Sequence, residues 1–322
     1  MLTPAAKIAE ELEPIADLLA DPTVTEIQIR HGGQHVFIER EGRTRLVNNR
    51  VFPCLEEAIR GLAGACGRDV PAAYPVVDAR LDAYDARMAA MLPPIARGGA
   101  MMTIRLFPRR YTLAELVESG MVDLVTADAL RAAVQQSQTL LISGHGGSGK
   151  TTLLHALLLE IPAEERVCII EEEGELVSEN PYVFQMETRG MLDTLDPARA
   201  ARPPVSLGAL VKASLRHSPG RILIGEVRGE EAAAMLMAMN TGHQGGITTI
   251  HANSATESLR RLAQCALMGS QGMTYEAAKG DVGRVIHGAI HVASRQVREY
   301  VTVQGYDLAT DTFDVTPSGG FA

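Results

Sequence analysis

The chain has 322 residues, of which 46 % are hydrophobic and 21 % charged, so it is long enough for two domains of about 150 residues and too apolar to be disordered throughout. Aromatic residues make up 4 % and Trp is absent, which favours an aliphatic core of helices on a buried parallel sheet over an aromatic-rich β-sandwich. The net charge of −9 lies entirely after residue 110 (14 basic and 14 acidic residues up to it, 16 and 25 beyond it), which argues against a broad basic surface for duplex nucleic acid.

The first third of the chain predicts a small α+β domain over residues 1–107. Apolar residues at helical spacing alternate there with short segments in which apolar and polar residues take turns, and Gly32-Gly33 separates two of these segments as in a β-hairpin. The pattern predicts helices over residues 5–20 and 55–66 and strands over residues 25–30, 35–40, 80–92 and 100–107.

Residues 108–116 are predicted to link this domain to a larger one over residues 117–322. Pro108 ends the preceding strand, and Thr112 is placed to cap the next helix together with Glu115. Beyond the linker, continuous apolar runs alternate with helical stretches, which predicts a mostly parallel sheet with helices on both faces. The predicted strands cover residues 139–143, 166–170, 221–225, 246–250 and 289–293, and a long loop is expected from about residue 187 to 207.

Cysteine spacing and the apolar runs indicate the cellular compartment. The four cysteines form no C-x-x-C pair, which argues against a zinc knuckle or a thioredoxin-like motif and predicts buried, reduced thiols. The N-terminus lacks the basic and apolar regions of a signal peptide, and the longest run of small apolar residues, Ala232 to Met239, is too short to span a membrane. We therefore expect a cytoplasmic protein that is peripheral to the inner membrane through protein partners.

A complete phosphate-binding pattern follows the predicted strand over residues 139–143. Residues 144–151 read GHGGSGKT, which fits G-x-x-x-x-G-K-[ST], and the apolar stretch after them is typical of a helix. Glycines let backbone N–H groups surround phosphate oxygens, and the positive end of the helix dipole points to the same place. A plain glycine-rich turn is the alternative, and the strand and helix on either side argue against it. The predicted nucleotide-binding residues are Gly144, His145, Gly146, Gly147, Ser148, Gly149, Lys150, Thr151 and Thr152.

Two of these residues have expected chemical roles. Lys150 is expected to neutralise the β- and γ-phosphates of ATP, and the Thr151 hydroxyl is expected to hold Mg²⁺.

Carboxylates follow two other predicted strands. Residues 171–175 read EEEGE after one strand, and Glu226 follows the strand over residues 221–225. The carboxyl ends of parallel strands form the rim at which α/β sheets bind ligands. Glu226 is therefore expected to orient or deprotonate the attacking water and to hold Mg²⁺, partly through water. The alternatives are a solvated acidic loop for residues 171–175 and a surface turn for Glu226.

Two histidines bracket the predicted strand over residues 246–250. Either one alone would be interpreted as structural. Because His251 follows a phosphate-binding loop and a strand-end glutamate, it is expected to sense phosphate or to couple hydrolysis to motion, whereas His243 has no such assignment. No pair among the histidines and cysteines has the spacing of metal ligands.

Four motifs in this order resemble the Walker A motif, Asp box, Walker B motif and His box of the GspE-like secretion ATPases. That superfamily serves type II and type IV secretion, conjugation and type IV pili. The front of the chain is also similar to the opening of the TrbB-type conjugal-transfer and CpaF-type tight-adherence branch, so the resemblance covers most of residues 10–305. The matching segments are residues 144–151, 170–176, 215–229 and 242–255, with residues 21–43 at the front.

The resemblance implies a hexameric ring of two-domain subunits that bind ATP between an N-terminal domain and a RecA-like P-loop ATPase domain. It implies that Arg87 and Arg105 of the N-terminal domain reach the γ-phosphate, where an arginine stabilises the charge of phosphoryl transfer. Ordinary surface arginines are the alternative for this pair. Arg216 and Arg228 are implied on the phosphate side or at a subunit interface.

The same match assigns the acidic residues. Glu171 and Glu175 would lie near the attacking water and the metal, and Glu226 would be the Walker B glutamate. Two positions depart from the family pattern: Glu172 stands where Asp is common, and Gly220 replaces an Asp near the Walker B strand. The four-cysteine zinc element of many pilus-assembly and type II secretion ATPases is absent from the sequence, which argues against that branch.

These features predict a Mg²⁺-dependent ATP hydrolase, a hexamer that powers a conjugative or type IV secretion apparatus through inner-membrane components. A pilus-retraction or tight-adherence motor is the alternative within the superfamily. A RecA-like DNA helicase or recombinase is the alternative from another class. The acidic, Trp-free second part lacks basic or aromatic strand-binding loops, so direct binding of nucleic acid is not expected.

Overall fold

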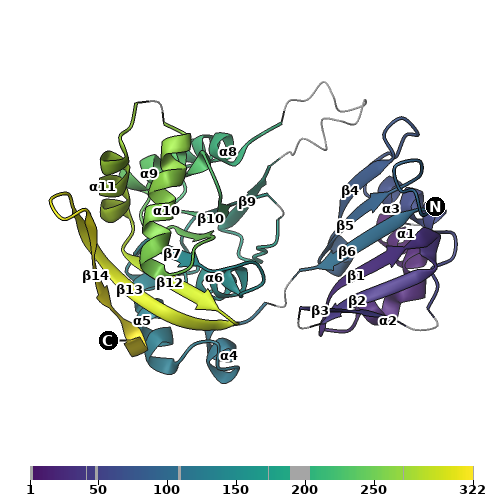
Figure 1. Cartoon of the computed structure of the whole chain (residues 1–322), viewed down its shortest axis with the longest axis horizontal. Helices are drawn as coiled ribbons and strands as arrows, with labels where there is room; N and C mark the ends of the chain where they lie inside the picture. Colours follow the sequence, from purple (N-terminus) through teal and green to yellow (C-terminus); the bar gives the residue numbers. More distant parts are fainter. Residues whose placement is uncertain are drawn as a thin grey trace. The chain divides into compact units, whose positions relative to one another are not determined.

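The computed structural model describes residues 3–40, 42–47, 50–107, 110–172, 174–188, 204–270 and 272–321. The described residues form two compact units, one ending at Phe107 and the other beginning at Arg110 (Figure 1). Each unit has its own β-sheet and its own hydrophobic core.

The first unit is a six-stranded antiparallel sheet with helices on one face. The strand order is β3-β2-β1-β6-β5-β4. Ile27 and Ile29 point to the core that the sheet shares with Leu12 and Leu62 of the helical layer. Its helices are α1 (Pro4–Glu11), α2 (Ala16–Leu19) and α3 (Leu55–Ala65), and its strands are β1 (Val24–Arg30), β2 (His35–Arg40), β3 (Arg43–Leu46), β4 (Val76–Leu81), β5 (Ala86–Met91) and β6 (Met101–Leu106).

Three local differences from the expected elements have simple causes. The helix expected over residues 5–20 is interrupted by a 3₁₀ turn over Glu13–Ile15, where Pro14 cannot donate a helical hydrogen bond. Residues 80–92 form parts of two strands rather than one, because Asp85 adopts a left-handed conformation (φ 45°) in the turn between β4 and β5. β3 was not expected, since all four of its residues are exposed and give no apolar signal.

The second unit is an eight-stranded, mostly parallel sheet. The strand order is β14-β13-β12-β7-β11-β10-β8-β9, and the six strands from β12 to β9 are parallel, whereas β13 and β14 form an antiparallel hairpin at one edge. The strands are β7 (Leu140–Ser143), β8 (Val167–Glu171), β9 (Val183–Glu187), β10 (Arg221–Val227), β11 (Ile247–Ile250), β12 (Gly288–Ala293), β13 (Gln296–Asp307) and β14 (Thr312–Pro317). The helices are α4 (Leu113–Glu118), α5 (Leu124–Gln135), α6 (Lys150–Leu158), α8 (Leu207–Ser214), α9 (Glu231–Asn240), α10 (Ala255–Met268) and α11 (Tyr275–Val285).

Helices cover both faces of this sheet (Figure 1). Leu140 and Ile142 of β7 face a core formed with α4, α5 and α6, whereas Leu141 between them faces a core formed with α8 to α11. The continuous apolar runs in the sequence reflect this two-sided burial. The predicted α/β class, with a RecA-like parallel sheet preceded by a smaller α+β unit, is therefore confirmed.

The expected cap is present, and one expectation about the cysteines is wrong. The Thr112 hydroxyl accepts from the backbone N–H of Glu115 at 3.2 Å, and the Glu115 carboxylate accepts from the backbone N–H of Thr112 at 2.8 Å. Cys54 is exposed and Cys66 half-buried, because Cys54 precedes α3 in a left-handed turn at the surface. Most of the long loop expected near residues 187–207 lies outside the described residues. Within the described part of the chain, no helix has the length and apolarity needed to cross a membrane.

Candidate functional site

The functional motifs of the second unit meet because their strands are parallel. The glycine loop follows β7, Glu171 ends β8, Glu226 is near the end of β10, and His251 follows β11. These four strands are neighbours in the order β7-β11-β10-β8, so their carboxyl ends lie along one edge of the sheet. The structure thus brings together side chains that are up to about a hundred residues apart in the chain.

The loop between β7 and α6 requires glycine at defined positions. A Cβ on Gly144 would lie 2.2 Å from the carbonyl oxygen of Val292, so strand β12 leaves no room for a side chain there. Gly147 (φ 70°) and Gly149 (φ 105°) adopt backbone conformations that L side chains rarely occupy. The loop can therefore curl back above the start of α6, as a phosphate-binding loop must.

Several donors of this loop are suited to an anionic ligand. The first turn of α6 has no side-chain cap, because its N-cap residue is Gly149. The Ser148 hydroxyl is buried without a hydrogen-bond partner. Nζ of Lys150 donates to the carbonyl oxygens of Gly144 (3.0 Å) and His145 (2.9 Å) of its own loop. Burial lowers the pKa of Lys150, against the attraction of Glu226. An uncapped helix start, an orphaned hydroxyl and a buried ammonium fit the phosphates of a nucleotide.

Glu226 lies at the centre of a small charged network. Its Oε2 accepts from Arg228 at 2.7 Å, and its Oε1 lies 2.7 Å from Nε2 of His251, within ion-pair distance but without the alignment of a hydrogen bond. Arg228 also donates to Glu172 at 3.0 Å, which connects the Walker B and Asp box segments. Partial burial of a side chain that is still 49 % exposed, followed by repulsion from Lys150, lowers the pKa of His251, so the neutral imidazole is favoured near neutral pH.

The carboxylates after β8 have different surroundings. Glu171 is 6 % exposed, and both of its oxygens accept from the backbone N–H of Leu176, at 3.2 and 3.0 Å. A Cβ on Gly225 would come within 3.0 Å of the Glu171 side chain, so β8 and β10 are packed closely at this point. Glu175 is half-buried, and Glu173 lies outside the described residues.

The two departures from the family pattern also have local explanations. Glu172 reaches Arg228, so the longer side chain still supplies a carboxylate to the network. Gly220 lies beside the backbone of Arg166, from whose carbonyl a Cβ would be 3.2 Å away, and its N–H donates to that carbonyl at 2.7 Å. Within the part of the chain that the structure describes, His243 forms no hydrogen bond to this network. Its Nδ1 lies 2.9 Å from the carbonyl oxygen of Pro219, at the opposite end of β11.

Arg87 and Arg105 are neighbours within the first unit. They pair directly across β5 and β6, so their side chains share the sheet face that the helices leave uncovered. Arg87 forms a bidentate ion pair with Asp78, with both distances at 2.8 Å, and Arg105 is exposed. Their action on a γ-phosphate stays a prediction, as does the role of Arg216, which is exposed in the 3₁₀ turn after α8.

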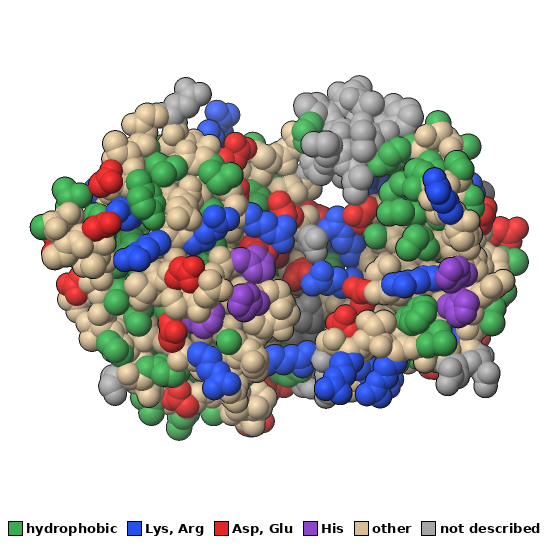
Figure 2. Space-filling model, in the orientation of Figure 1, with side chains coloured by type: hydrophobic (Ala, Val, Ile, Leu, Met, Phe, Trp, Pro, Cys, Tyr) green, Lys and Arg blue, Asp and Glu red, His purple; other side chains and the backbone are tan. Residues whose placement is uncertain are grey.

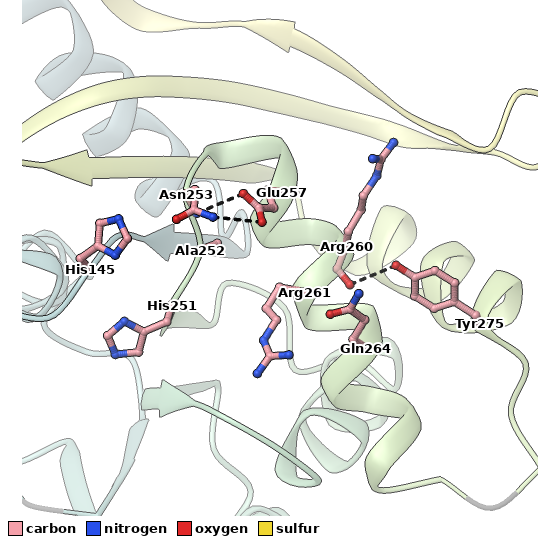
Figure 3. A pocket seen from close by; sticks show the side chains of 9 residues that line it. All are labelled: His145, His251, Ala252, Asn253, Glu257, Arg260, Arg261, Gln264 and Tyr275. Atoms are coloured by element: carbon pink, nitrogen blue, oxygen red, sulfur yellow. Dashed lines mark hydrogen bonds between the residues drawn. The ribbon is translucent and has the colours of Figure 1, made fainter.

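Two arginines on α10 were not singled out from the sequence. Arg260 and Arg261 line a cavity of about 590 Å³ together with His145 of the glycine loop and with His251 and Asn253 after β11 (Figure 3). A sequence signal for α10 existed, because Ser254 near the end of the His box and Glu257 form a helix start, and the Ser254 hydroxyl accepts from the Glu257 N–H at 3.0 Å. Only the fold places the exposed side of this helix next to the glycine loop.

Comparison with known proteins adds a family to this geometry. The family model described as type II/IV secretion system protein matches residues 8–287. The conjugal transfer protein TrbB of Rhizobium radiobacter is 34 % identical over 89 % of this chain and 86 % of its own length. The type IV secretion system protein PtlH homolog of Bordetella bronchiseptica is 31 % identical over 90 % of this chain and 91 % of its own length.

A solved structure supports the fold. The Legionella pneumophila ATPase DotB aligns with a TM-score of 0.59 and 21 % identity, over 98 % of this chain and 80 % of DotB. The sequence matches confirm the resemblance to the secretion ATPases and to their TrbB-type branch. The chain belongs to the type II/IV secretion system protein family.

Proposed function

We propose that this protein is a hexameric ATPase whose hydrolysis of ATP powers a conjugative or type IV secretion apparatus. The observation that carries the proposal is the meeting, at one sheet edge, of a phosphate-binding loop with unsatisfied donors and a carboxylate beside a neutral histidine. The names of the relatives, a conjugal transfer protein and a type IV secretion protein, support the pathway. The protein would work in the cytoplasm, peripheral to the inner membrane through protein partners.

The chemistry assigns a role to each residue of the second unit. The loop N–H groups and Lys150 would hold the phosphates of ATP, so that Lys150 exchanges its two loop carbonyls for phosphate oxygens. Thr151 and Glu226 would hold Mg²⁺, partly through water, and the metal supplies positive charge to the β- and γ-phosphates. Glu226 would orient the attacking water and accept its proton, and His251 would report the γ-phosphate to β11.

The remaining assignments follow from the family. Glu171 and Glu175 would lie near the water and the metal, and Arg87 and Arg105 would reach the γ-phosphate from the N-terminal unit. Closure of the N-terminal unit on bound ATP, and reopening after hydrolysis, would be the motion passed to membrane partners.

Two variants test the hydrolytic site. Lys150→Ala is expected to lose nucleotide binding, because it removes the only cationic side chain of the loop. Glu226→Gln keeps the shape of the side chain but removes the base, so it is expected to bind ATP normally and to hydrolyse it at least about 100-fold more slowly. Binding is measured with a fluorescent ATP analogue and hydrolysis by phosphate release.

Glu276→Gln is the matched control, because Glu276 is exposed on α11 and lines neither the loop nor the carboxylate network. Wild-type hydrolysis by Lys150→Ala or Glu226→Gln, measured on hexameric protein, would refute the proposed function.

A further inference from the structure

The cavity beside the glycine loop has the composition of an oxyanion site. His145 contributes from the loop, His251 and Asn253 from the segment after β11, and Arg260 and Arg261 from α10 (Figure 3). Figure 2 shows histidine and basic side chains close together on the face of the unit that carries α10. With Glu257, the lining carries two positive charges and one negative charge. The other side chains that can donate hydrogen bonds are those of His145, His251, Asn253, Gln264 and Tyr275.

Glu257, the acidic residue of this lining, accepts hydrogen bonds from Asn253. Oε1 of Glu257 accepts from Nδ2 of Asn253 at 3.2 Å, and Oε2 accepts from the Asn253 N–H at 3.3 Å. The carboxylate therefore holds the segment after β11, and within the described residues it forms no ion pair with either arginine, although its negative charge stays in the lining. Within the described residues, the Arg261 guanidinium has neither a hydrogen bond nor an ion pair.

The two arginines are directed differently. In Figure 3 the Arg261 side chain extends from α10 on the side of the two histidines, whereas Arg260 extends the opposite way. Hydrogen bonds from Lys279 and Tyr306 are the main reason that the pKa of Asp311 in the β13–β14 turn is lowered, and the positive charge of Arg260 adds to their effect. Arg261 is therefore the cation directed into the cavity.

The position of the cavity indicates which oxyanion it receives. His251 lines it and also lies 2.7 Å from Glu226, the carboxylate expected at the hydrolysed bond. His145 lines it and belongs to the loop that holds the phosphates. A phosphate ion formed among His145, His251 and Glu226 has the cavity directly beside it. A guanidinium is the side chain best shaped to bind the oxygens of that ion.

We propose that this cavity binds inorganic phosphate, with Arg261 as its principal contact, and that it receives the phosphate product after hydrolysis. The assignment of the phosphate to ATP rests on the proposed function, whereas the binding site itself does not. Arg260 and Asn253 contribute positive potential and a hydrogen-bond donor at its margin.

The test is a titration of the full-length protein with inorganic phosphate while the glycine loop is filled with saturating Mg·ADP. Isothermal titration calorimetry is expected to give one phosphate per chain. Arg261→Ala should weaken this binding at least tenfold, and Arg261→Lys should weaken it less, because it keeps the charge but loses the planar donor pair. In steady-state assays, Arg261→Ala should raise the inhibition constant of phosphate by the same factor.

Arg284→Ala is the matched control, because Arg284 is exposed on neighbouring α11, pairs with Asp281, and does not line the cavity. Absence of phosphate binding to the Mg·ADP complex, or equal binding by Arg261→Ala and wild type, would overturn the inference and leave the hydrolytic function standing. Arg261-dependent phosphate binding by a protein that hydrolyses no ATP would support the site and refute the proposed function instead.

Discussion

At the scale of single residues, the glycine loop depends on backbone conformations and close approaches that only glycine allows. Gly144 has a φ of 153° and lies against the carbonyl of Val292, which is 2.2 Å from where a Cβ would be. Gly146, two residues later, has nothing within 4 Å of its Cβ position. The two positions therefore provide a matched pair within one motif.

We predict that Gly144→Ala lowers the free energy of unfolding by about 2 kcal/mol or more, since β7 and β12 must separate to admit the methyl group. Gly146→Ala should change the free energy of unfolding by less than about 0.5 kcal/mol. Urea unfolding of both variants measures the difference. Equal stability of the two would show that β12 does not confine the loop.

Histidines with lowered pKa values make the stability depend on pH. Burial is the largest cause of a lowered pKa at His155, His251, His287 and His291, each below the ordinary value of 6.5. At pH values between the lowered pKa values and 6.5, the unfolded chain binds protons that the folded chain does not. The free energy of unfolding therefore decreases as the pH falls through this interval. These histidines contribute fully to the free energy of unfolding above pH 6.5, and that contribution is lost as the pH falls through the interval.

The free energy of unfolding is therefore expected to fall between about pH 7 and about pH 5, above the range in which carboxylates titrate. His287 tests the cause, because its Nδ1 accepts from the Thr139 N–H at 3.1 Å. His287→Asn keeps an acceptor there but cannot titrate, so the loss on acidification should become smaller. An unchanged slope in this variant would assign the pH dependence to other groups.

At the scale of elements, a buried arginine joins the end of α5 to the strands. Arg221 begins β10 with 1 % of its side chain exposed, forms a bidentate ion pair with Glu165, and donates to the carbonyl of Val134 at 2.6 Å. A guanidinium buried in this way is tolerated only while its partner carboxylate is present.

Glu165→Ala is expected to cost about 3 kcal/mol of unfolding free energy, because it leaves the charge of Arg221 buried and unpaired. Asp128→Ala breaks a surface ion pair with Arg131 and should cost less than about 1 kcal/mol. Denaturant unfolding compares the two variants. Similar losses from both would mean that water reaches Arg221.

At the scale of the whole molecule, the proposed motor needs more than one copy of the chain. The resemblance implies a ring of six chains of 34.5 kDa each. Size-exclusion chromatography with light scattering, with and without a non-hydrolysable ATP analogue, is expected to show a six-chain particle that the analogue stabilises. A protein that stays monomeric under all conditions would contradict the motor, although the nucleotide site of each chain would be unaffected.

Much of the second unit could be predicted from the sequence alone. The five apolar runs became strands β7, β8, β10, β11 and β12, because a strand buried on both faces has a nearly continuous apolar sequence. The glycine loop was predictable from its motif, since the spacing of its residues follows from how a loop surrounds a phosphate, although the close approach of Val292 to Gly144 was not.

The less regular parts could not be predicted in this way. The exposed edge strand β3 has no apolar alternation, and the turn at Asp85 depends on one left-handed residue that a periodic pattern does not reveal. Strand β3 and the turn at Asp85 depend on single residues or on hydrogen bonds, and a search for periodic apolar residues does not detect either.

The periodic elements and the residue types of the site follow from the sequence, because periodicity and motif spacing are local properties of the chain. The tertiary structure was needed to show that β11 lies between β7 and β10, that Glu226 lies between His251 and Arg228, and that Arg261 lines the same cavity as His145 of the loop. These contacts join segments far apart in the chain, and they arise only when the two faces of the sheet are packed against their helices.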